Sequence, residues 1–142
     1  VSQGTDPNAG TGVGQRAVTG VTLDNASATA AMMATNRVVY FDYDSFAIRP
    51  EFQPVIEAHA KFVKGDKARK VAIEGHTDER GGREYNLALG QKRAEAVRRA
   101  MSLQCVTESQ IEAVSFGKEK PAVQGTTEAA FEKNRRAEIS YR

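Results

Sequence analysis

The sequence has little of several features that mark particular classes of protein. Its single cysteine, Cys105, excludes an intrachain disulfide, and the simplest prediction for this residue is a small apolar filler. No run approaches the roughly 18 consecutive apolar residues that span a bilayer. The formal net charge of +2 is too small to indicate nucleic-acid binding. Zinc-type clusters of histidine and cysteine and glycine-rich phosphate motifs are also missing. We therefore predict no metal, no cofactor and no nucleic-acid partner.

Residues 1–36 differ in composition from the rest of the chain. They contain no aromatic residue, and their charged side chains are Asp6, Arg16 and Asp24. Ser, Thr, Ala, Asn and Gly dominate, and this mixture offers too little apolar surface to offset the entropy lost on ordering. We predict a flexible linker over residues 1–36, with a weak helical turn around residues 28–34, followed by a folded domain over residues 37–142.

From residue 37 onward, the apolar pattern alternates between the periods of strands and helices. Strands are predicted at residues 38–41, 70–74, 111–116 and 137–141. Helices are predicted at residues 50–64, 84–103 and 127–134, with Thr127 as a possible N-cap. This order predicts an α/β (α+β) two-layer sandwich, in which a mixed four-stranded sheet carries helices on one face.

One charged residue stands where the long helix needs an apolar one. At helical spacing, the apolar stripe runs from Tyr85 through Leu89 to Val97, and Arg93 falls within it. A guanidinium group keeps its proton, so Arg93 must either reach water or meet an anion. The identity of that anion is the functional question that this helix raises.

Acidic residues follow the first two predicted strands. Asp44 comes after the first strand, and Asp78 comes after the second in a turn that contains Gly81. Ligands gather at the carboxyl ends of strands in α/β layers, so Asp44 joins Asp78 there if these strands form a parallel pair. Asn86 lies on nearly the same helix face as Arg93. Two carboxylates and an arginine, which grips carboxylates bidentately, complement a zwitterion such as an amino-acid centre.

Other assignments of these residues remain open. Taken alone, Asp78 is typical of a turn or cap aspartate. His76 fits a pocket wall and a surface position equally well, and no serine or cysteine elbow motif favours nucleophilic catalysis. A glycosidase-like pair of Asp44 and Asp78 would lack a general acid, because an adjacent arginine keeps both ionised. We therefore predict a binding protein rather than an enzyme. Three further charged residues are assigned to solvated surface: Arg83, Glu84 and Arg135.

Several blocks of this sequence, in order, resemble the OmpA-like peptidoglycan-binding domain family. They are VYFDYDS (residues 39–45), EGHTDERG (74–81), EYN (84–86), LGQKRA (89–94), SFGKEKP (115–121) and KNRRA (133–137). The resemblance covers residues 37–142, about three quarters of the chain. The ERG, EYN and GKEKP segments favour the lipoprotein group of the Tol–Pal system over the barrel-attached or flagellar-stator members.

The resemblance implies non-catalytic binding of the peptidoglycan peptide stem through its diaminopimelate residue. Carried over residue by residue, the aspartate of the family's Gly-x-Thr-Asp motif is Asp78, and the arginine of its Lys-Arg-Ala motif is Arg93. The acidic residue that closes the first-strand motif is Asp44. Neighbouring pocket positions are matched by three further residues: Thr77, Asn86 and Leu89. Diaminopimelate has a zwitterionic centre, which agrees with the charge pattern described above.

The resemblance also implies a location and partners. Mature members of the lipoprotein group begin with a lipid-bearing cysteine, whereas this sequence starts at Val1 and contains only Cys105. We expect the anchor to lie upstream, with residues 1–36 as a tether that spans about 35 Å to the wall. The implied location is the periplasmic face of the outer membrane. The implied partners are peptidoglycan, the outer membrane and a Tol-system β-propeller protein. An adaptor whose main partner is that propeller protein is the alternative function.

Overall fold

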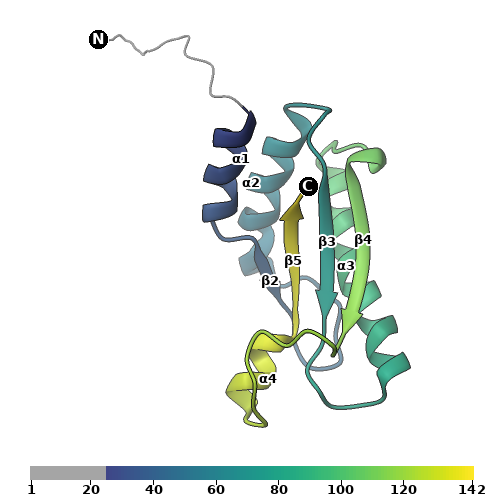
Figure 1. Cartoon of the computed structure of the whole chain (residues 1–142). Helices are drawn as coiled ribbons and strands as arrows, with labels where there is room; N and C mark the ends of the chain where they lie inside the picture. The colour runs from purple at the N-terminus through teal and green to yellow at the C-terminus, as the bar shows by residue number, and fades with distance from the viewer. Residues whose placement is uncertain (1–24) are drawn as a thin grey trace. The chain divides into compact units, whose positions relative to one another are not determined.

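The structure is a computed structural model and describes residues 25–142 (Figure 1). Residues 1–24 of the predicted linker lie outside the described residues, so the linker and its boundary at residue 36 stay predictions. Helix α1 (Asn25–Ala34) is longer than the predicted turn. Its sequence is rich in alanine and methionine, which are strong helix formers. Among the residues that the structure describes, no helix is both long and apolar enough to cross a membrane.

Four strands form one mixed sheet in the order β2-β5-β3-β4. These strands are β2 (Val38–Tyr40), β3 (Val71–His76), β4 (Ile111–Gly117) and β5 (Arg136–Tyr141). β3 pairs in parallel with β4, whereas β5 is antiparallel to both β2 and β3. The first two strands do not form the parallel pair considered above, because the last strand lies between them. Both strands oppose β5 and so run in the same direction, which leaves their carboxyl ends at one edge of the sheet.

The helical segments agree with the predicted order. They are η1 (Pro50–Phe52), α2 (Gln53–Lys64), α3 (Arg83–Leu103), η2 (Glu108–Gln110) and α4 (Glu128–Asn134). Thr127 is the N-cap of α4, as predicted, and its hydroxyl oxygen accepts a 3.2 Å hydrogen bond from the Ala130 N–H. Figure 1 shows α4 and the start of α3 at the end of the sheet where β2, β3 and β4 finish.

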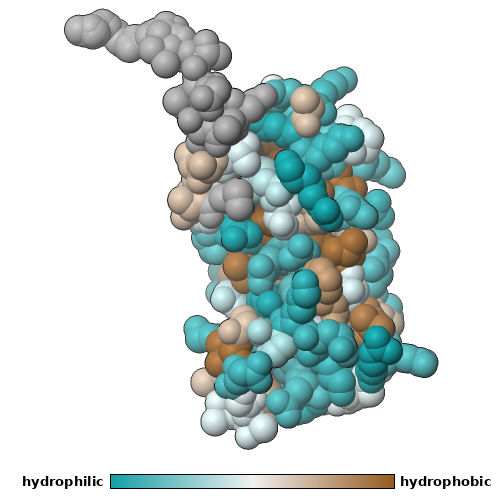
Figure 2. All heavy atoms as spheres, viewed as in Figure 1, coloured by the Kyte–Doolittle hydropathy of each residue, from teal (hydrophilic) through white to brown (hydrophobic). Residues whose placement is uncertain are grey.

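The core lies between the sheet and two helices. Helices α2 and α3 pack against one face through apolar residues, which include Ile56, Val63 and Val97, and the strands contribute Ile73 and Ile139. The other face of the sheet is largely hydrophilic, with small separated hydrophobic patches (Figure 2). Each strand therefore alternates between a core side and a polar side. The predicted two-layer α+β architecture is confirmed.

Cys105 does not fill the core as predicted, because it is exposed and follows the end of α3. Its φ of 74° is left-handed, a conformation common just after a helix. The Cys105 N–H donates to the Ser102 carbonyl at 3.0 Å, and the Val106 N–H donates to the Met101 carbonyl at 3.3 Å. These two bonds form a Schellman motif, so Cys105 ends the helix through its backbone rather than through its side chain.

A glycine pair brings α3 unusually close to the sheet. A Cβ atom added to Gly75 of β3 would lie 1.8 Å from the Gly90 carbonyl oxygen of α3. A Cβ atom added to Gly90 would lie 2.4 Å from the Ser115 hydroxyl oxygen. Only glycine therefore fits at either position. This contact sets the depth of Arg93, which follows Gly90 by three residues.

We expect Gly75→Ala to lower the free energy of unfolding by about 2 kcal/mol or more, because the added methyl group must push helix and strand apart. The matched control is Gly65→Ala, whose Cβ atom would make ordinary contacts at 3.4 Å or more with φ at −67°. Urea unfolding of both variants measures the effect. Equal stability of Gly75→Ala and the wild type would contradict the close contact.

Candidate functional site

A cavity of about 160 Å³ lies at the edge of the sheet where β2 and β3 end. All six predicted site residues line it: Asp44, Thr77, Asp78, Asn86, Leu89 and Arg93. Its remaining lining residues are Tyr43, Arg80, Gly81 and Tyr85. The structure therefore brings together residues from the loop after β2, the loop after β3 and helix α3.

Arg93 is fully buried, and backbone carbonyl oxygens surround its guanidinium group. Nε donates to Ser45 O at 2.8 Å, Nη1 to His76 O at 2.9 Å and Nη2 to Asp42 O at 3.1 Å. Within the described part of the chain, no ion pair joins Arg93 to an acidic side chain. Of its five N–H groups, one on each Nη atom is left without an acceptor there. Arg93 therefore ties the loop after β2 to the end of β3.

Burial is also the main electrostatic influence on Arg93. Burial and then the positive charge of Arg135 lower the pKa of Arg93 to about 10, while Asp78 and Asp44 act in the opposite direction. The group remains a cation at neutral pH. Its charge is thus balanced by acids across the cavity and by carbonyl dipoles around it, without a direct ion pair.

Asp44 lies on the exposed rim of the cavity. Its backbone is left-handed, with φ at 54°, which aspartate tolerates better than most residues. The turn that carries it is closed by a 3.1 Å hydrogen bond from Ser45 N to Asp42 O. The Tyr85 hydroxyl donates to the Asp44 carboxylate. Helix α3 therefore holds this loop through Tyr85 as well as through Arg93.

Asp78 lies deeper in the cavity and is paired with two arginines. The Asp78 side chain is 5% exposed, and its Oδ2 lies 2.7 Å from Arg80 Nη2 and 3.5 Å from Arg135 Nη1. Its Oδ1 accepts the Arg80 backbone N–H at 3.0 Å. Burial raises the pKa of Asp78, but the hydrogen bonds and charge of Arg80, with the hydrogen bond of Arg135, together lower it. Asp78 is therefore ionised at neutral pH.

Thr77, Asn86 and Leu89 shape the cavity rather than charge it. The Thr77 N–H donates to Gly117 O at 2.9 Å, which continues the pairing of β3 with β4. Asn86 is buried, and its amide donates to Arg80 O at 2.9 Å, which fixes the loop after β3. Leu89 is almost fully buried and supplies an apolar wall.

The assignment of Arg135 to solvated surface is wrong. Its side chain is 7% exposed, with Nε donating to Phe41 O at 3.0 Å and Nη1 lying 3.3 Å from Glu128. Arg83 is 71% exposed and Glu84 is exposed, as predicted. Sequence reasoning also left out Arg80 as a cavity residue. The sequence carries no signal that would place Arg80 or Arg135 at the site, because neither residue falls within an apolar pattern that indicates burial.

His76 does not line the cavity. Its backbone carbonyl accepts from Arg93, but its ring stacks on Phe116 at 5.5 Å between centroids. Burial and the charge of Arg136 lower the pKa of His76 to about 4, although Glu138 acts in the opposite direction. The imidazole is therefore neutral at physiological pH. Its ring packs on Phe116 of β4, outside the cavity that the predicted site residues line.

A second cavity of about 250 Å³ lies on the other side of Arg135, between Arg49 and Lys133. Arg49 is already paired there with the Asp42 carboxylate at 3.1 Å. Among residues 25–142, no group of three or more histidine, cysteine or acidic residues is placed to hold a metal ion. The 160 Å³ cavity is therefore the candidate site, because it alone of the two gathers the predicted residues.

The sequence profile of the OmpA family matches residues 40–135. The chain belongs to the OmpA family. It is 46% identical over 136 residues to the peptidoglycan-associated lipoprotein of Pseudomonas aeruginosa, an alignment that covers 96% of this chain and 77% of that protein. It is 50% identical over 103 residues to the peptidoglycan-associated lipoprotein of Pasteurella multocida, covering 72% of this chain and 69% of that protein.

Solved structures of this OmpA-family fold agree with the described one. The crystal structure of the peptidoglycan-associated lipoprotein of Burkholderia pseudomallei superposes with a TM-score of 0.74 at 53% identity, covering 75% of this chain and 91% of that one. The C-terminal domain of MotB from Helicobacter pylori has a TM-score of 0.70 at 23% identity, covering 77% and 85%. The MotB likeness shows the fold alone. The predicted family and fold class are thereby confirmed.

We expect His76→Phe to reduce the loss of stability in mild acid. Between about pH 6.5 and pH 4 the unfolded chain binds a proton that folded His76 does not, so this contribution to stability is present above pH 6.5 and falls as the pH drops toward 4. Through this group, the free energy of unfolding changes by at most about 1.4 kcal/mol per pH unit. Phenylalanine keeps the stacking on Phe116 and removes the titration.

Urea unfolding of the wild type and His76→Phe at about pH 7 and about pH 4.5 measures the slope. His59, whose pKa is also lowered by burial, is present in both proteins and cancels in the comparison. Parallel pH dependences for the two proteins would rule out His76 as the source.

Proposed function

We propose that this domain binds the peptide stem of peptidoglycan through the zwitterionic end of diaminopimelate, without catalysis. The observation that carries the proposal is the cavity, which is lined by the Arg93 cation and by the carboxylate residues Asp44 and Asp78. It is further supported by the relatives, whose names describe lipoproteins associated with peptidoglycan. A cavity of about 160 Å³ suits one end of a side chain rather than a whole stem.

The cavity suggests a role for each residue. One N–H on each Nη atom of Arg93 has no acceptor in the described chain, and these two groups would donate to the ligand carboxylate. The ammonium group would then lie between the carboxylates of Asp44 and Asp78, which line the same cavity. Leu89 and the ring of Tyr85 would contact the methylene groups of the ligand. Three hydrogen bonds already hold Arg93, so little reorganisation of this side chain is needed on binding.

The ionisation of the cavity favours binding over catalysis. Asp78 lies between two arginines that lower its pKa, so it cannot serve as a general acid near neutral pH. The His76 ring stacks on Phe116 and does not line the cavity, so it cannot exchange a proton with a ligand held there. We infer a protein that holds the cell wall without changing it chemically.

We further propose that the domain works at the periplasmic face of the outer membrane and links that membrane to the wall within the Tol–Pal system. The names of the relatives describe lipoproteins, which supports a lipid anchor in the full-length protein. Diaminopimelate as the bound residue, the anchor and the Tol–Pal role all depend on the relationship to these proteins.

A Tol-system β-propeller protein is the second candidate partner. Three aromatic side chains near the cavity are well exposed: Tyr43 at 63%, Phe46 at 47% and Tyr85 at 55%. Exposed aromatic residues of this kind are enriched at protein–protein interfaces. A protein that covered them would also cover the mouth of the cavity, so we expect it to compete with the peptide stem.

We expect Asp78→Asn to weaken binding of a stem tripeptide that ends in meso-diaminopimelate by about 30-fold or more, because a buried charge pair with the ligand ammonium is lost. Asp44→Asn should weaken the same binding to a smaller extent, because Asp44 is exposed. Isothermal titration with the tripeptide and pull-down on purified sacculi measure both effects.

Arg83→Gln is the matched control, since Arg83 is exposed and does not line the cavity. Thermal melts establish that each variant is folded. Wild-type affinity in folded Asp78→Asn would exclude the cavity as the wall-binding site. Titration with the propeller protein, with and without the tripeptide, separates the two candidate partners.

A further inference from the structure

We propose that Arg80 is a displaceable internal cation that occupies Asp78 in the free domain and swings out when the ligand ammonium arrives. This inference depends on the proposed function and names a competitor within the same site. In this proposal Arg80 lowers the affinity for the ligand and sets its selectivity, whereas Arg93 raises the affinity. A ligand without an ammonium group has nothing to exchange for Arg80, so the device favours zwitterions.

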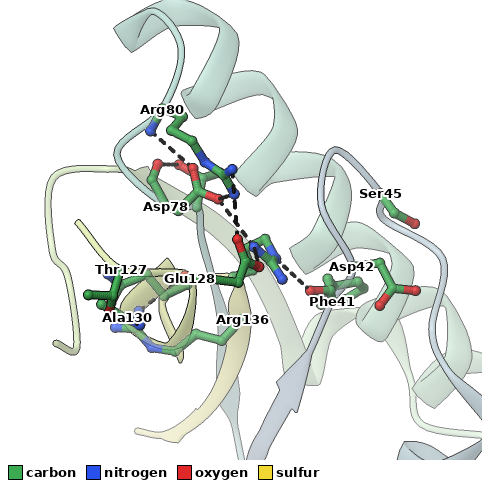
Figure 3. Close-up of polar contacts among 12 residues, drawn as sticks. Phe41, Asp42, Ser45, Asp78, Arg80, Thr127, Glu128, Ala130 and Arg136 are labelled. Atoms are coloured by element: carbon green, nitrogen blue, oxygen red, sulfur yellow. Dashed lines mark hydrogen bonds and ion pairs between the residues drawn. The ribbon is translucent and has the colours of Figure 1, made fainter. Parts of the chain in front are cut away.

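The first observation is that Arg80 already occupies the acceptor that an ammonium group needs. Its Nη2 lies 2.7 Å from Asp78 Oδ2, the shortest ion-pair contact of that carboxylate. The other oxygen, Oδ1, is taken by the Arg80 backbone N–H. Figure 3 shows the Arg80 side chain directed at the Asp78 carboxylate, with Glu128 nearby. A ligand ammonium group that approaches Oδ2 therefore competes with the Arg80 guanidinium for this oxygen.

The second observation is that Asp78 supplies the only side-chain hydrogen bond of the Arg80 guanidinium group within the described chain, while two aromatic rings and Glu128 make its other contacts. Its Cζ lies 4.4 Å from the Tyr43 ring centroid and 4.3 Å from the Phe131 ring centroid. Its Nη1 lies 3.9 Å from a Glu128 oxygen, and its Nε has no hydrogen-bond partner within the described chain. The side chain is 37% exposed, so water can solvate it as it leaves. This partial satisfaction contrasts with Arg93, which makes three carbonyl bonds.

The third observation is that the Arg80 backbone has hydrogen bonds of its own, independent of the side chain. Its N–H donates to Asp78 Oδ1, and its carbonyl accepts from Asn86 Nδ2 at 2.9 Å. The next residue, Gly81, accepts from Lys118 Nζ at 2.9 Å. The side chain can therefore change rotamer without moving the loop that walls the cavity. Arg135 remains 3.5 Å from Asp78 Oδ2, so the carboxylate stays compensated throughout the exchange.

We expect Arg80→Gln to bind the stem tripeptide L-Ala-D-Glu-meso-diaminopimelate about tenfold more tightly than the wild type. This value follows if Arg80 holds Asp78 for about nine tenths of the time in the free domain, because apparent affinity scales with the competent fraction. Arg80→Lys, which retains a cation without the planar fork, should lie between the two. Isothermal titration measures the three dissociation constants.

Two controls isolate the exchange. Arg83→Gln removes the same charge three residues away, where Arg83 pairs with Glu119 at 3.3 Å outside the cavity, and should match the wild type. The second control is the tripeptide with 2-aminopimelate in place of diaminopimelate, which keeps the terminal carboxylate but lacks the ammonium group. Arg80→Gln should bind this analogue no more tightly than the wild type does.

The direction of the change decides the proposal. Weaker or unchanged binding of the diaminopimelate tripeptide by folded Arg80→Gln would show that Arg80 holds the ligand or stands apart from it, and would overturn the proposal. An equal gain for both tripeptides would reduce the effect to net charge and would overturn it as well. Failure of the wild type and every variant to bind the diaminopimelate tripeptide would refute the proposed function itself, which the wild-type titration alone reveals.

Discussion

The site depends on one buried guanidinium group and the three backbone carbonyls that surround it. Arg93 donates to Asp42 O and Ser45 O in the loop after β2 and to His76 O at the end of β3. Taking a charge out of water costs several kcal/mol, and hydrogen bonds to a charged group return about 1.5–3 kcal/mol each. The carbonyls thus make the buried position tolerable, and in return Arg93 joins the loop after β2 to the end of β3, although β2 and β3 do not pair with each other. Tyr85 and Arg135 add further ties in the same region, through Asp44 and through Phe41 O and Asp78.

The rest of the fold serves to place that group. The close contact of Gly75 with Gly90 lets α3 approach the sheet, and Arg93 follows one turn later beside the end of β3. Strand β5 separates β2 from β3, but its antiparallel pairing with both keeps their carboxyl ends together. Arg135, just before β5, links Phe41 O to the Asp78 and Glu128 carboxylates. The cavity is therefore lined by three segments distant in sequence, the loop after β2, the loop after β3 and helix α3, which Arg93 and Arg135 tie together.

The features that could be predicted from the sequence are those that change the local pattern of apolar and charged residues. Arg93 interrupted an apolar stripe, Asp44 and Asp78 followed strands, and the order of elements matched the two-layer fold. Sequence reasoning did not place β5 between β2 and β3, because strand pairing depends on tertiary packing that alternation alone does not encode. It expected Arg93 to reach water or meet an anion, whereas backbone carbonyls hold it, since main-chain acceptors are present at every residue and have no signature. It assigned Arg135 to the surface and overlooked Arg80, because a charged residue that forms ion pairs looks like any solvated one in sequence.

The most direct test is a crystal structure of the domain with a bound stem tripeptide that ends in meso-diaminopimelate. The guanidinium group of Arg93 should keep its three carbonyl bonds, and its two remaining N–H groups should lie within hydrogen-bond distance of the terminal ligand carboxylate. A ligand bound elsewhere on the domain, or an Arg93 that abandons the carbonyls of Asp42, Ser45 and His76 to reach it, would contradict this description of the site.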